Sequence, residues 1–536
     1  MTALRRAGRS QRPPSPLLTA AAALVAAACA LPLLYLLVRA ASGGSAAWSV
    51  LGRPQTAETV ARTVALVAVV TLGATVVGGA LAWLVERTDL PLRRMWALAA
   101  ALPLAIPSYV VALALLGTLG PGGALSQALP GAGVADTGFP GAALALTLST
   151  YPYVYLLTAA ALRRADPALE EAARGLGRSP RGVLAGVTLP LVRPALGAGA
   201  LLAALYALSD FGVVSLMRFD ALTRVIFQQY RTLFDRTPAA VLGLVLVVLT
   251  VVVLVLEARA RGRAAPRAAS TASRPAPRQP LGRWRPAAVA FCSAVAGLAL
   301  VLPLGVLAWW TLRGATGAGL SVETVTAGFN SLMVSIGAGA VATVAALPVA
   351  LLVVRDPRAL TRSLERLAYG ANALPGVVIA LALVFFAARY AGAVYGTLAV
   401  LMFAYLVRFL PQALSGAHTA LLSVNPQLEE AARALGRGPR SAFAAITLPL
   451  AAPGLLAGAA IVFLSTMKEL PATLLLRPIG FDTLATEVWT ATSVSAYARA
   501  APAALLLVAV AAPIVLRLTA RPDRGSPSGA EGLGAG

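Results

Sequence analysis

Two acidic residues stand inside long apolar runs, where a charge is costly and therefore informative. Ser209 precedes Asp210, and 259 residues further on Lys468 precedes Glu469. Ionisable groups in a membrane-spanning helix usually face a cavity or one another. Because carboxylate oxygens suit hard cations, these four residues are candidates for a cation passage or outer gate, with the two acids facing each other. The alternative is that both acids are hydrated at the outer interface, with Lys468 paired to an acid.

Other kinds of chemistry lack the residues that they need. The chain has a single histidine, His418, and two cysteines, Cys29 and Cys292, both in apolar runs. Neither a disulfide framework nor a thiolate metal site has enough ligands, and the sequence assigns no metal site. A P-loop requires a lysine directly before Ser or Thr, whereas the only lysine, Lys468, precedes a glutamate. The sequence therefore argues against an intramembrane enzyme and against ATP binding by that motif.

A polar stretch that contains a glycine is written twice in the same apolar chain. The first copy consists of Glu171, Ala172, Ala173, Gly177 and Pro190, and the second of Glu430, Ala431, Ala432, Gly436 and Pro449. The offset between the copies is 259 residues, with no gap. A well-capped, solvated loop would explain one such stretch. Two copies with identical spacing favour a paired, rigid knob that docks onto a partner which is itself paired.

Local signals predict a short helix, a sharp turn and a second helix in each copy. Asp166 before Pro167 has the form of an N-cap followed by proline at the first helical position, and Asn425 before Pro426 repeats it. The glycine of each copy has the form of a helix stop. Each copy also has an acid four residues before an arginine, which predicts an ion pair on the helix surface. The pairs are Glu170 with Arg174 and Glu429 with Arg433.

The elements that must position these residues are membrane helices. Of the 536 residues, 58% are hydrophobic and 12% are charged, whereas roughly a quarter of the residues of a soluble domain are charged. The net charge of +23 raises the question of nucleic acid. The arginines, however, lie in short loops between apolar runs rather than on one polar face, so the charge is a topology signal and no nucleic-acid partner is expected.

Twelve apolar runs predict an all-α polytopic membrane protein that spans the lipid bilayer about 12 times. The expected spans are residues 17–41, 61–84, 95–118, 139–162, 190–215, 238–256, 287–311, 329–354, 370–388, 394–416, 449–475 and 501–519. They form two tandem six-helix units, residues 1–257 and 287–520, joined by a basic linker at 258–286 and followed by a disordered tail at 521–536. Because the units repeat in the same orientation, a pseudo-twofold axis along the membrane normal is expected.

Basic residues set the expected orientation. With a cytoplasmic N-terminus, 31 of the 44 basic residues lie on the cytoplasmic side, in agreement with the positive-inside rule. Both copies of the repeated stretch and both termini are then cytoplasmic. One outer loop is a misfit, because it carries the cluster Arg218, Arg224, Arg231 and Arg236. This loop could meet a soluble binding protein through its charges, or it could pack onto the outer helices.

The repeated stretch carries a resemblance to a known family. The pattern Glu-Ala-Ala, three residues, Gly, nine residues, an aliphatic residue, one residue, Leu-Pro resembles the coupling-loop signature of binding-protein-dependent ABC importer permeases. Both copies fit at every fixed position, with Val187 where the second copy has Ile446. The fusion of two six-helix units, which covers nearly the whole chain, is similar to the ferric-iron permease family, of which the thiamine permeases are near relatives.

The resemblance implies the membrane subunit of an ABC importer in a bacterial plasma (inner) membrane. It implies no catalytic residue and no cofactor in this chain, because ATP and Mg are bound by two copies of a cytoplasmic ATP-binding subunit. An extracytoplasmic substrate-binding protein is the other expected partner. The repeated residues would form the ATPase contacts. Ferric iron is the expected cargo and thiamine or another small solute the alternative, while an ATP-independent secondary transporter would have no use for duplicated cytoplasmic knobs.

Overall fold

The computed structural model describes residues 15–119, 138–232, 237–261, 278–314, 321–356 and 358–519. Within these ranges the regular elements are helices, apart from one isolated bridge between Thr88 and Gln279. Ten helices are long and apolar enough to cross a membrane, and a bent pair raises the number to 11. The chain is therefore an all-α polytopic membrane protein, as the sequence predicts. The predicted tail at 521–536 and most of the predicted linker lie outside the described residues.

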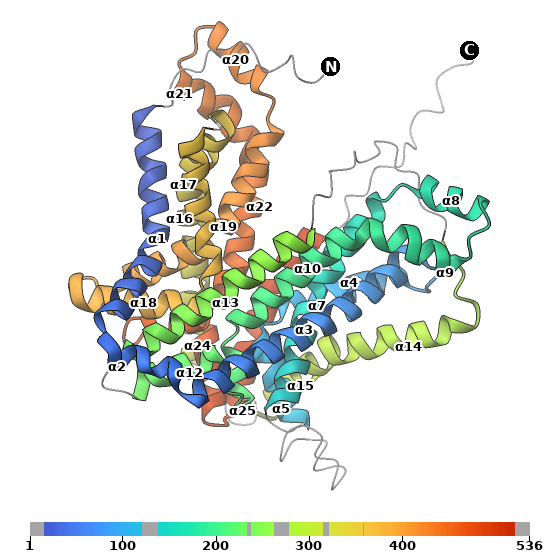
Figure 1. Cartoon of the computed structure of the whole chain (residues 1–536), viewed down its shortest axis with the longest axis horizontal. Coiled ribbons are helices and arrows are strands. Elements are labelled where there is room, and N and C mark those ends of the chain that lie inside the picture. Colours follow the sequence, from blue (N-terminus) through green and yellow to red (C-terminus); the bar gives the residue numbers. More distant parts are fainter. Residues whose placement is uncertain are drawn as a thin grey trace.

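The elements of the first half follow one another in a simple order (Figure 1). They are α1 (Pro16–Ser42), α2 (Gly44–Trp48), η1 (Ser49–Gly52), α3 (Pro54–Arg87), α4 (Arg93–Ala101), η2 (Leu102–Ala105), α5 (Ser108–Leu119), α7 (Phe139–Arg164), α8 (Pro167–Gly175), α9 (Pro180–Val183), η3 (Leu184–Thr188), α10 (Leu189–Ser209), α11 (Gly212–Leu216), α12 (Leu222–Thr232) and α13 (Thr237–Arg261).

The second half repeats this order. It consists of η4 (Gly282–Trp284), α14 (Arg285–Ala296), η5 (Gly297–Val301), α15 (Leu302–Gly314), α16 (Val322–Arg355), α17 (Ala359–Gly370), η6 (Ala371–Ala373), α18 (Gly376–Tyr390), α19 (Leu398–Ser423), α20 (Pro426–Ala434), α21 (Pro439–Ala442), η7 (Phe443–Thr447), α22 (Leu448–Met467), α23 (Pro471–Leu476), α24 (Leu484–Ser493) and α25 (Tyr497–Thr519).

Three long helices form the centre of each half: α3, α7 and α10 in the first, and α16, α19 and α22 in the second. Small residues let these helices approach closely, as is usual between membrane helices. A Cβ atom added to Gly78 of α3 would lie 2.6 Å from the carbonyl oxygen of Tyr151 on α7. A Cβ atom on Gly416 of α19 would lie 2.8 Å from the Cα atom of Gly458 on α22.

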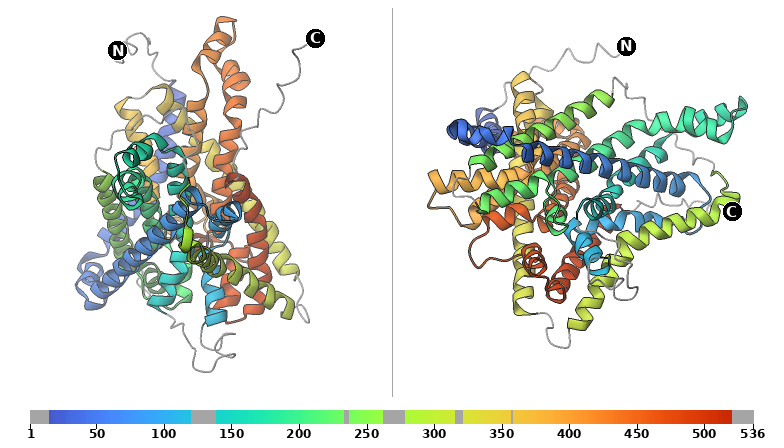
Figure 2. Two further views of the ribbon diagram at one scale, coloured as in Figure 1. Left: turned by 90° about the vertical axis from the view of Figure 1, so that its right-hand side faces the viewer. Right: turned by 60° about the horizontal axis from the view of Figure 1, so that its bottom comes forward.

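The two halves are interlocked through their first helices. Helix α1 packs against α16, α17 and α18 of the second half, whereas α14 and α15 pack against α4 and α5 of the first. Figures 1 and 2 show α1 beside the second half and α14 beside the first. Each six-helix unit thus completes its packing with a helix from the other, so the units do not sit side by side as independent bodies.

Four of the predicted spans are broken rather than continuous. The third span turns by 100° between Ala105 and Ser108, next to Pro107, which lacks an N–H for a helical hydrogen bond. Its counterpart in the second half is reduced to the 15-residue helix α18. The fifth and eleventh spans break next to the intramembrane acids. There the backbone carbonyls of Asp210 and Glu469 accept hydrogen bonds from threonine hydroxyls, each at 2.7 Å, which satisfies backbone groups that the membrane cannot.

Candidate functional site

The repeated stretch forms the same knob in both halves, as its local signals predict. Helix α8 begins after Asp166, whose Oδ1 accepts a hydrogen bond from the N–H of Ala168 at 3.0 Å. Helix α20 begins after Asn425, whose Oδ1 accepts from the N–H of Gln427 at the same distance. The two knobs lie at well-separated places on the molecule (Figures 1 and 2). Two matching helix–turn–helix elements are therefore presented apart from each other.

Glycine ends each knob helix through a left-handed turn. Gly177 has φ +80° and Gly436 has φ +86°. In the first copy the N–H of Gly177 donates to the carbonyl of Arg174 at 2.9 Å, and the N–H of Arg178 donates to that of Ala173 at 3.1 Å. This pair of bonds is a Schellman motif, and the second copy repeats it. After the turn both copies continue through a short helix into a π-helical segment, η3 or η7.

The acid that precedes the motif is buried, so the predicted ion pair with Arg174 forms but does not lie on the surface. Glu170 is 2% exposed. Its Oε1 accepts a hydrogen bond from Thr188 Oγ1 at 3.0 Å and lies 3.3 Å from Arg87 Nη2, while Arg174 Nη2 lies 3.6 Å from Oε2. Arg87 ends α3 and Thr188 ends η3. The carboxylate therefore clamps α8 to a central membrane helix and to the second limb of the knob.

The second copy builds the same clamp around Glu429. Its Oε2 accepts from Thr447 Oγ1 at 2.8 Å and from Arg355 Nη2 at 2.8 Å, and its Oε1 accepts from Arg433. Burial raises the pKa of Glu429, but the hydrogen bond from Thr447 and the two guanidinium groups outweigh burial, so the pKa lies below its ordinary value. Sequence reasoning missed the clamps, although Arg87 and Arg355 occupy matching places in the two halves.

An exposed leucine stands at the tip of each knob. Leu176 is 85% exposed and Leu435 is 86% exposed. The motif residues Glu171, Ala172, Gly177 and Pro190, and their counterparts Glu430, Ala431, Gly436 and Pro449, are exposed as well, whereas Ala173 and Ala432 are buried against the rest of the knob. A large apolar side chain held in solvent on a rigid polar element is a feature of interaction surfaces. Neither leucine is among the residues predicted from the sequence.

The four predicted intramembrane residues line one cavity between the two halves. The cavity measures about 180 Å³, and its lining includes Ser209, Asp210, Lys468 and Glu469. Tyr109, Tyr153 and Tyr206 contribute from the first half, and Arg408, Gln412 and Ser465 from the second. The structure therefore brings together residues from α10 and α22 that are far apart in the sequence.

Each cavity acid is accommodated differently by its own half. Asp210 is 8% exposed, and it accepts hydrogen bonds from Ser108 Oγ at 2.5 Å and from the N–H of Val213 at 2.8 Å. Glu469 is also 8% exposed. In the second half the residue that corresponds to Ser108 is Gly376, and a Cβ atom added there would lie 2.6 Å from Glu469 Oε1. The shorter acid thus meets a serine, and the longer acid meets a glycine that leaves room for it.

Two cations from the second half share this cavity. Arg408 Nε lies 3.9 Å from Glu469 Oε2, and Arg408 Nη1 donates to the carbonyl of Leu374 at 2.6 Å. Lys468 Nζ donates to the carbonyl of Leu104 at 2.7 Å, rather than pairing with an acid. Because Leu104 lies in η2 of the first half, just before the break in the third span, Lys468 joins the two halves at this level.

A second, larger cavity lies at the end of the molecule opposite the knobs. We name it the vestibule; it measures about 500 Å³ and is lined by α11, α12 and the region around the end of α24. Phe211 lines both the vestibule and the central cavity. Its ring centroid lies 4.6 Å from that of Phe227 and 5.1 Å from that of Trp489. Phe211 therefore lies where the two cavities adjoin, and its aromatic neighbours line the vestibule.

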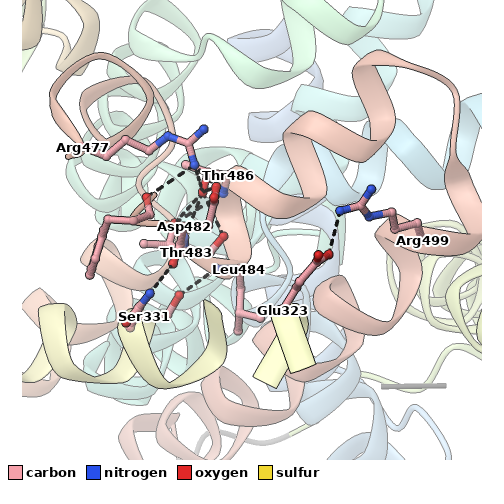
Figure 3. A network of polar contacts seen from close by, with 10 residues as sticks. Glu323, Ser331, Arg477, Asp482, Thr483, Leu484, Thr486 and Arg499 are labelled. Carbon is pink, nitrogen blue, oxygen red and sulfur yellow. Dashed lines mark hydrogen bonds and ion pairs between the residues drawn. The ribbon is translucent and has the colours of Figure 1, made fainter. Parts of the chain in front are cut away.

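Polar contacts hold the loops at this end onto the long helices. In the second half Arg477 pairs with Asp482, and the N–H of Leu484 donates to Ser331 Oγ of α16 at 2.8 Å (Figure 3). In the first half the N–H of Leu222 donates to Thr63 Oγ1 of α3 at 3.0 Å. The loops therefore pack onto the long helices through α12 and α24.

The predicted arginine cluster is split by the structure. Arg218 and Arg224 line the vestibule, Arg231 lies with its guanidinium carbon 5.8 Å from the centre of the Phe227 ring, and Arg236 lies outside the described residues. Among the described residues, no group of three or more His, Cys, Asp or Glu side chains is placed to hold a metal ion.

Comparison with known proteins identifies both halves. The family described as "Binding-protein-dependent transport system inner membrane component" matches residues 74–263 and again 335–520. The Fe(3+)-transport system permease protein FbpB 2 of Haemophilus influenzae is 35% identical over 484 residues, which cover 89% of this chain and 93% of that protein. The probable ABC transporter permease protein y4fN of Sinorhizobium fredii is 26% identical over 455 residues, 78% of this chain and 79% of that protein.

Proposed function

We propose a function from one premise: the chain belongs to the family of binding-protein-dependent transport system inner membrane components. It is an ABC importer permease, a transport subunit. We infer that its cargo is ferric iron. The observation that supports this cargo is the similarity to the Fe(3+)-transport permease of Haemophilus influenzae, which extends over 89% of the chain. Thiamine or another small solute is the alternative cargo.

In this proposal the two knobs receive the ATP-binding subunits. Two separate knobs, each with an exposed leucine at its tip, fit two copies of one partner. ATP and Mg bind in those partners. Because Glu170 clamps α8 to α3 and Glu429 clamps α20 to α16, a displacement of a docked knob acts directly on the central helices of its half. Rocking of the two halves would then alternate access to the central cavity.

The central cavity is the proposed passage. Its two carboxylates can attract a cation, while Arg408 and Lys468 balance their formal charge. Transport requires a site that binds well enough to admit the cargo and weakly enough to release it. A cavity with two acids and two cations suits passage better than storage. The aromatic cluster around Phe211 would be the barrier on the outer side of this passage.

An ATP-independent secondary transporter is the competing mechanism. Helices broken near intramembrane acids are common in such transporters, and α10 and α22 of this chain both end at such breaks. The duplicated knobs favour the importer, because two exposed leucines on rigid polar elements have no role in transport by a chain acting alone. The arginine distribution supports an inner-membrane protein with both termini on the cytoplasmic side.

Docking can be tested at the two glycines that end the knob helices. Gly177 and Gly436 have positive φ angles, and an added Cβ atom would meet nothing within 4 Å. Replacing both by valine therefore strains the turn without a clash. We expect loss of ATPase-subunit association with membrane insertion intact. The matched control is Gly175→Ala, since the second copy carries Ala434 at this place. Retained association in the double valine variant would contradict the docking role.

The cargo can be tested separately. Importers of this kind receive their cargo from a soluble binding protein, so the ligand of the binding protein encoded beside this chain identifies it. Tight binding of ferric iron would support the proposal. Binding of thiamine, with no binding of iron, would refute the cargo while leaving the docking role untouched.

A further inference from the structure

The vestibule has a chemistry that the proposed transport cycle leaves unused. Its lining carries the guanidinium groups of Arg218 and Arg224 and hydroxyl groups that include those of Ser495 and Tyr497. Among the described residues that line it there is no carboxylate. Phe211 lines both the vestibule and the central cavity. The vestibule is therefore a positive, hydroxyl-bearing hollow that adjoins the passage at Phe211.

Arg218 occupies a backbone position that favours glycine. Its φ angle is +53°. The N–H of Arg218 donates to the carbonyl of Ser215 at 3.2 Å, and the N–H of Phe219 donates to that of Val214 at 2.8 Å. These bonds close the end of α11 in a left-handed turn, the place where helices commonly carry glycine. A side chain with a Cβ atom is strained there.

The second half supplies an internal comparison. Gly480 precedes Phe481 and Asp482, as Arg218 precedes Phe219 and Asp220. Gly480 also has a left-handed conformation, with φ +79°. The turns themselves differ, because the N–H of Phe481 donates to the carbonyl of Pro478 at 3.1 Å, beyond the end of α23. The left-handed residue before Phe and Asp is nevertheless a glycine in one half and an arginine in the other. An arginine held in a conformation that favours glycine indicates a role for its side chain.

Ser495, which the second half contributes to the lining, shows the same strain. Its φ angle is +60°, and its N–H donates to the carbonyl of Thr492 at 2.9 Å at the end of α24. Of the described residues, three other than glycine have positive φ angles, and two of them, Arg218 and Ser495, line the vestibule. Strained residues of this kind gather where a side chain must be held in a particular place for function.

The charge of Arg218 is not neutralised within the described chain. Arg224 pairs with Asp220, whereas Arg218 has no carboxylate partner among the described residues and its side chain is exposed. A guanidinium group matches the oxygen geometry of phosphate and carboxylate through paired N–H donors. The Ser495 hydroxyl adds a neutral donor. Such a set recognises an oxyanion.

We propose that the vestibule is a binding site for a small oxyanion, phosphate or a carboxylate, with Arg218 as its main ligand and Ser495 as a second donor. A hollow of about 500 Å³ with aromatic walls suits a small ion better than the acidic surface of a protein. The oxyanion reaches the site either free or as a ligand of the cargo. The site itself does not depend on iron being that cargo.

Arg218→Gly tests the proposal without threatening the fold, because glycine is the residue that the left-handed turn at the end of α11 favours. The probe is inorganic phosphate, measured by equilibrium dialysis against the purified complex with its ATP-binding subunits at low salt. We expect saturable binding that weakens by about tenfold or more in Arg218→Gly, as for the loss of a charge-assisted contact. The thermal midpoint should stay equal or rise, since the strain is relieved.

The control is Arg499→Gln, which removes one positive charge from an exposed ion pair with Glu323 at the same end of the molecule. Phosphate binding should be unchanged in it. Equal weakening in both variants would reduce the effect to overall charge and overturn the proposal. Unchanged phosphate binding in Arg218→Gly would overturn it as well, and if capture of the substrate-binding protein were lost instead, the vestibule would be a protein docking surface.

The source of the oxyanion is resolved by a second arm on the wild-type complex. Citrate is offered alone and as its ferric complex. Tighter binding of the ferric complex, lost in Arg218→Gly, identifies the oxyanion as a companion of the metal. Equal binding of the two forms, again lost in Arg218→Gly, identifies a site for the free ion. Both results support the site, and only the first also bears on the proposed cargo.

Discussion

Removing the carboxylate of Glu170 should destabilise the first knob far more than removing the carboxylate of Glu429 destabilises the second knob. The two acids occupy matching places and have matching kinds of partners. Their surroundings differ, however, because the Arg87 side chain is 3% exposed whereas that of Arg355 is 41% exposed. The same substitution therefore leaves a buried charge in the first half and a largely hydrated one in the second.

The expected magnitudes follow from that difference. The nitrogen atoms of the Arg87 side chain are buried and make no hydrogen bond among the described residues, so its charge is compensated by nearby carboxylates, chiefly Glu170 and to a lesser degree Glu86. Breaking a buried ion pair by removing one partner costs about 3–5 kcal/mol. After Glu429→Ala, water can reach Arg355, and the loss is closer to that of hydrogen bonds to a charged group, about 1.5–3 kcal/mol.

Amide hydrogen exchange of α8 and α20 in detergent or nanodiscs measures both losses locally. A difference of about 2 kcal/mol corresponds to about 30-fold in an opening equilibrium. Each variant is compared with wild type, and the increase in the exchange rate of α8 in Glu170→Ala should be about 30 times the increase in the exchange rate of α20 in Glu429→Ala. The double variant Arg87→Met with Glu170→Met should recover most of the protection, because it removes both buried charges.

Two results would refute this reasoning. Equal loss of protection in the two alanine variants would mean that burial of the arginine does not set the cost. Failure of the double methionine variant to recover protection would mean that Glu170 acts through something other than the charge of Arg87, such as its hydrogen bond from Thr188.

Three further predictions concern docking, pH and the barrier. Replacing Leu176 and Leu435 by glutamate should abolish co-purification of the ATP-binding subunit with no change in thermal midpoint, because both side chains are exposed; retained co-purification would contradict docking at the tips. Since the pKa of Glu429 lies below its ordinary value of 4.5, its stabilising effect is present above pH 4.5 and is lost as the pH falls through the lowered pKa. The protection of α20 should fall over that range in wild type but not in Glu429→Gln. Phe211→Ala should speed labelling of Ser209→Cys by a membrane-impermeant thiol reagent added from outside, and an unchanged rate would mean that the aromatic cluster is not the barrier.

Features encoded by neighbouring residues could be predicted from the sequence. The caps at Asp166 and Asn425 and the stops at Gly177 and Gly436 follow from local backbone preferences, and the structure confirms all four. The all-α membrane fold follows from composition. The duplicated motif identified the knobs, because a repeat within one chain is visible without any partner.

Features that depend on distant contacts could not be predicted. The spacing of Glu170 and Arg174 fits a surface pair, and only the fold brings the end of α3 close enough for Arg87 to meet Glu170. The breaks at Asp210 and Glu469 also escaped the sequence reasoning, because the runs around them are apolar enough for continuous spans. The hydroxyls of Thr223 and Thr473 stabilise these breaks, because they donate hydrogen bonds to the backbone carbonyls of Asp210 and Glu469.

Uptake of radioactive ferric iron into proteoliposomes tests the central claim most directly. The vesicles contain this chain with its ATP-binding subunits, and the iron-loaded binding protein is added outside. We predict iron uptake that requires both ATP inside and the binding protein outside, and that is lost when Gly177 and Gly436 are replaced by valine. Uptake that persists without ATP, or ATP-driven uptake of a different solute with no uptake of iron, would contradict the account.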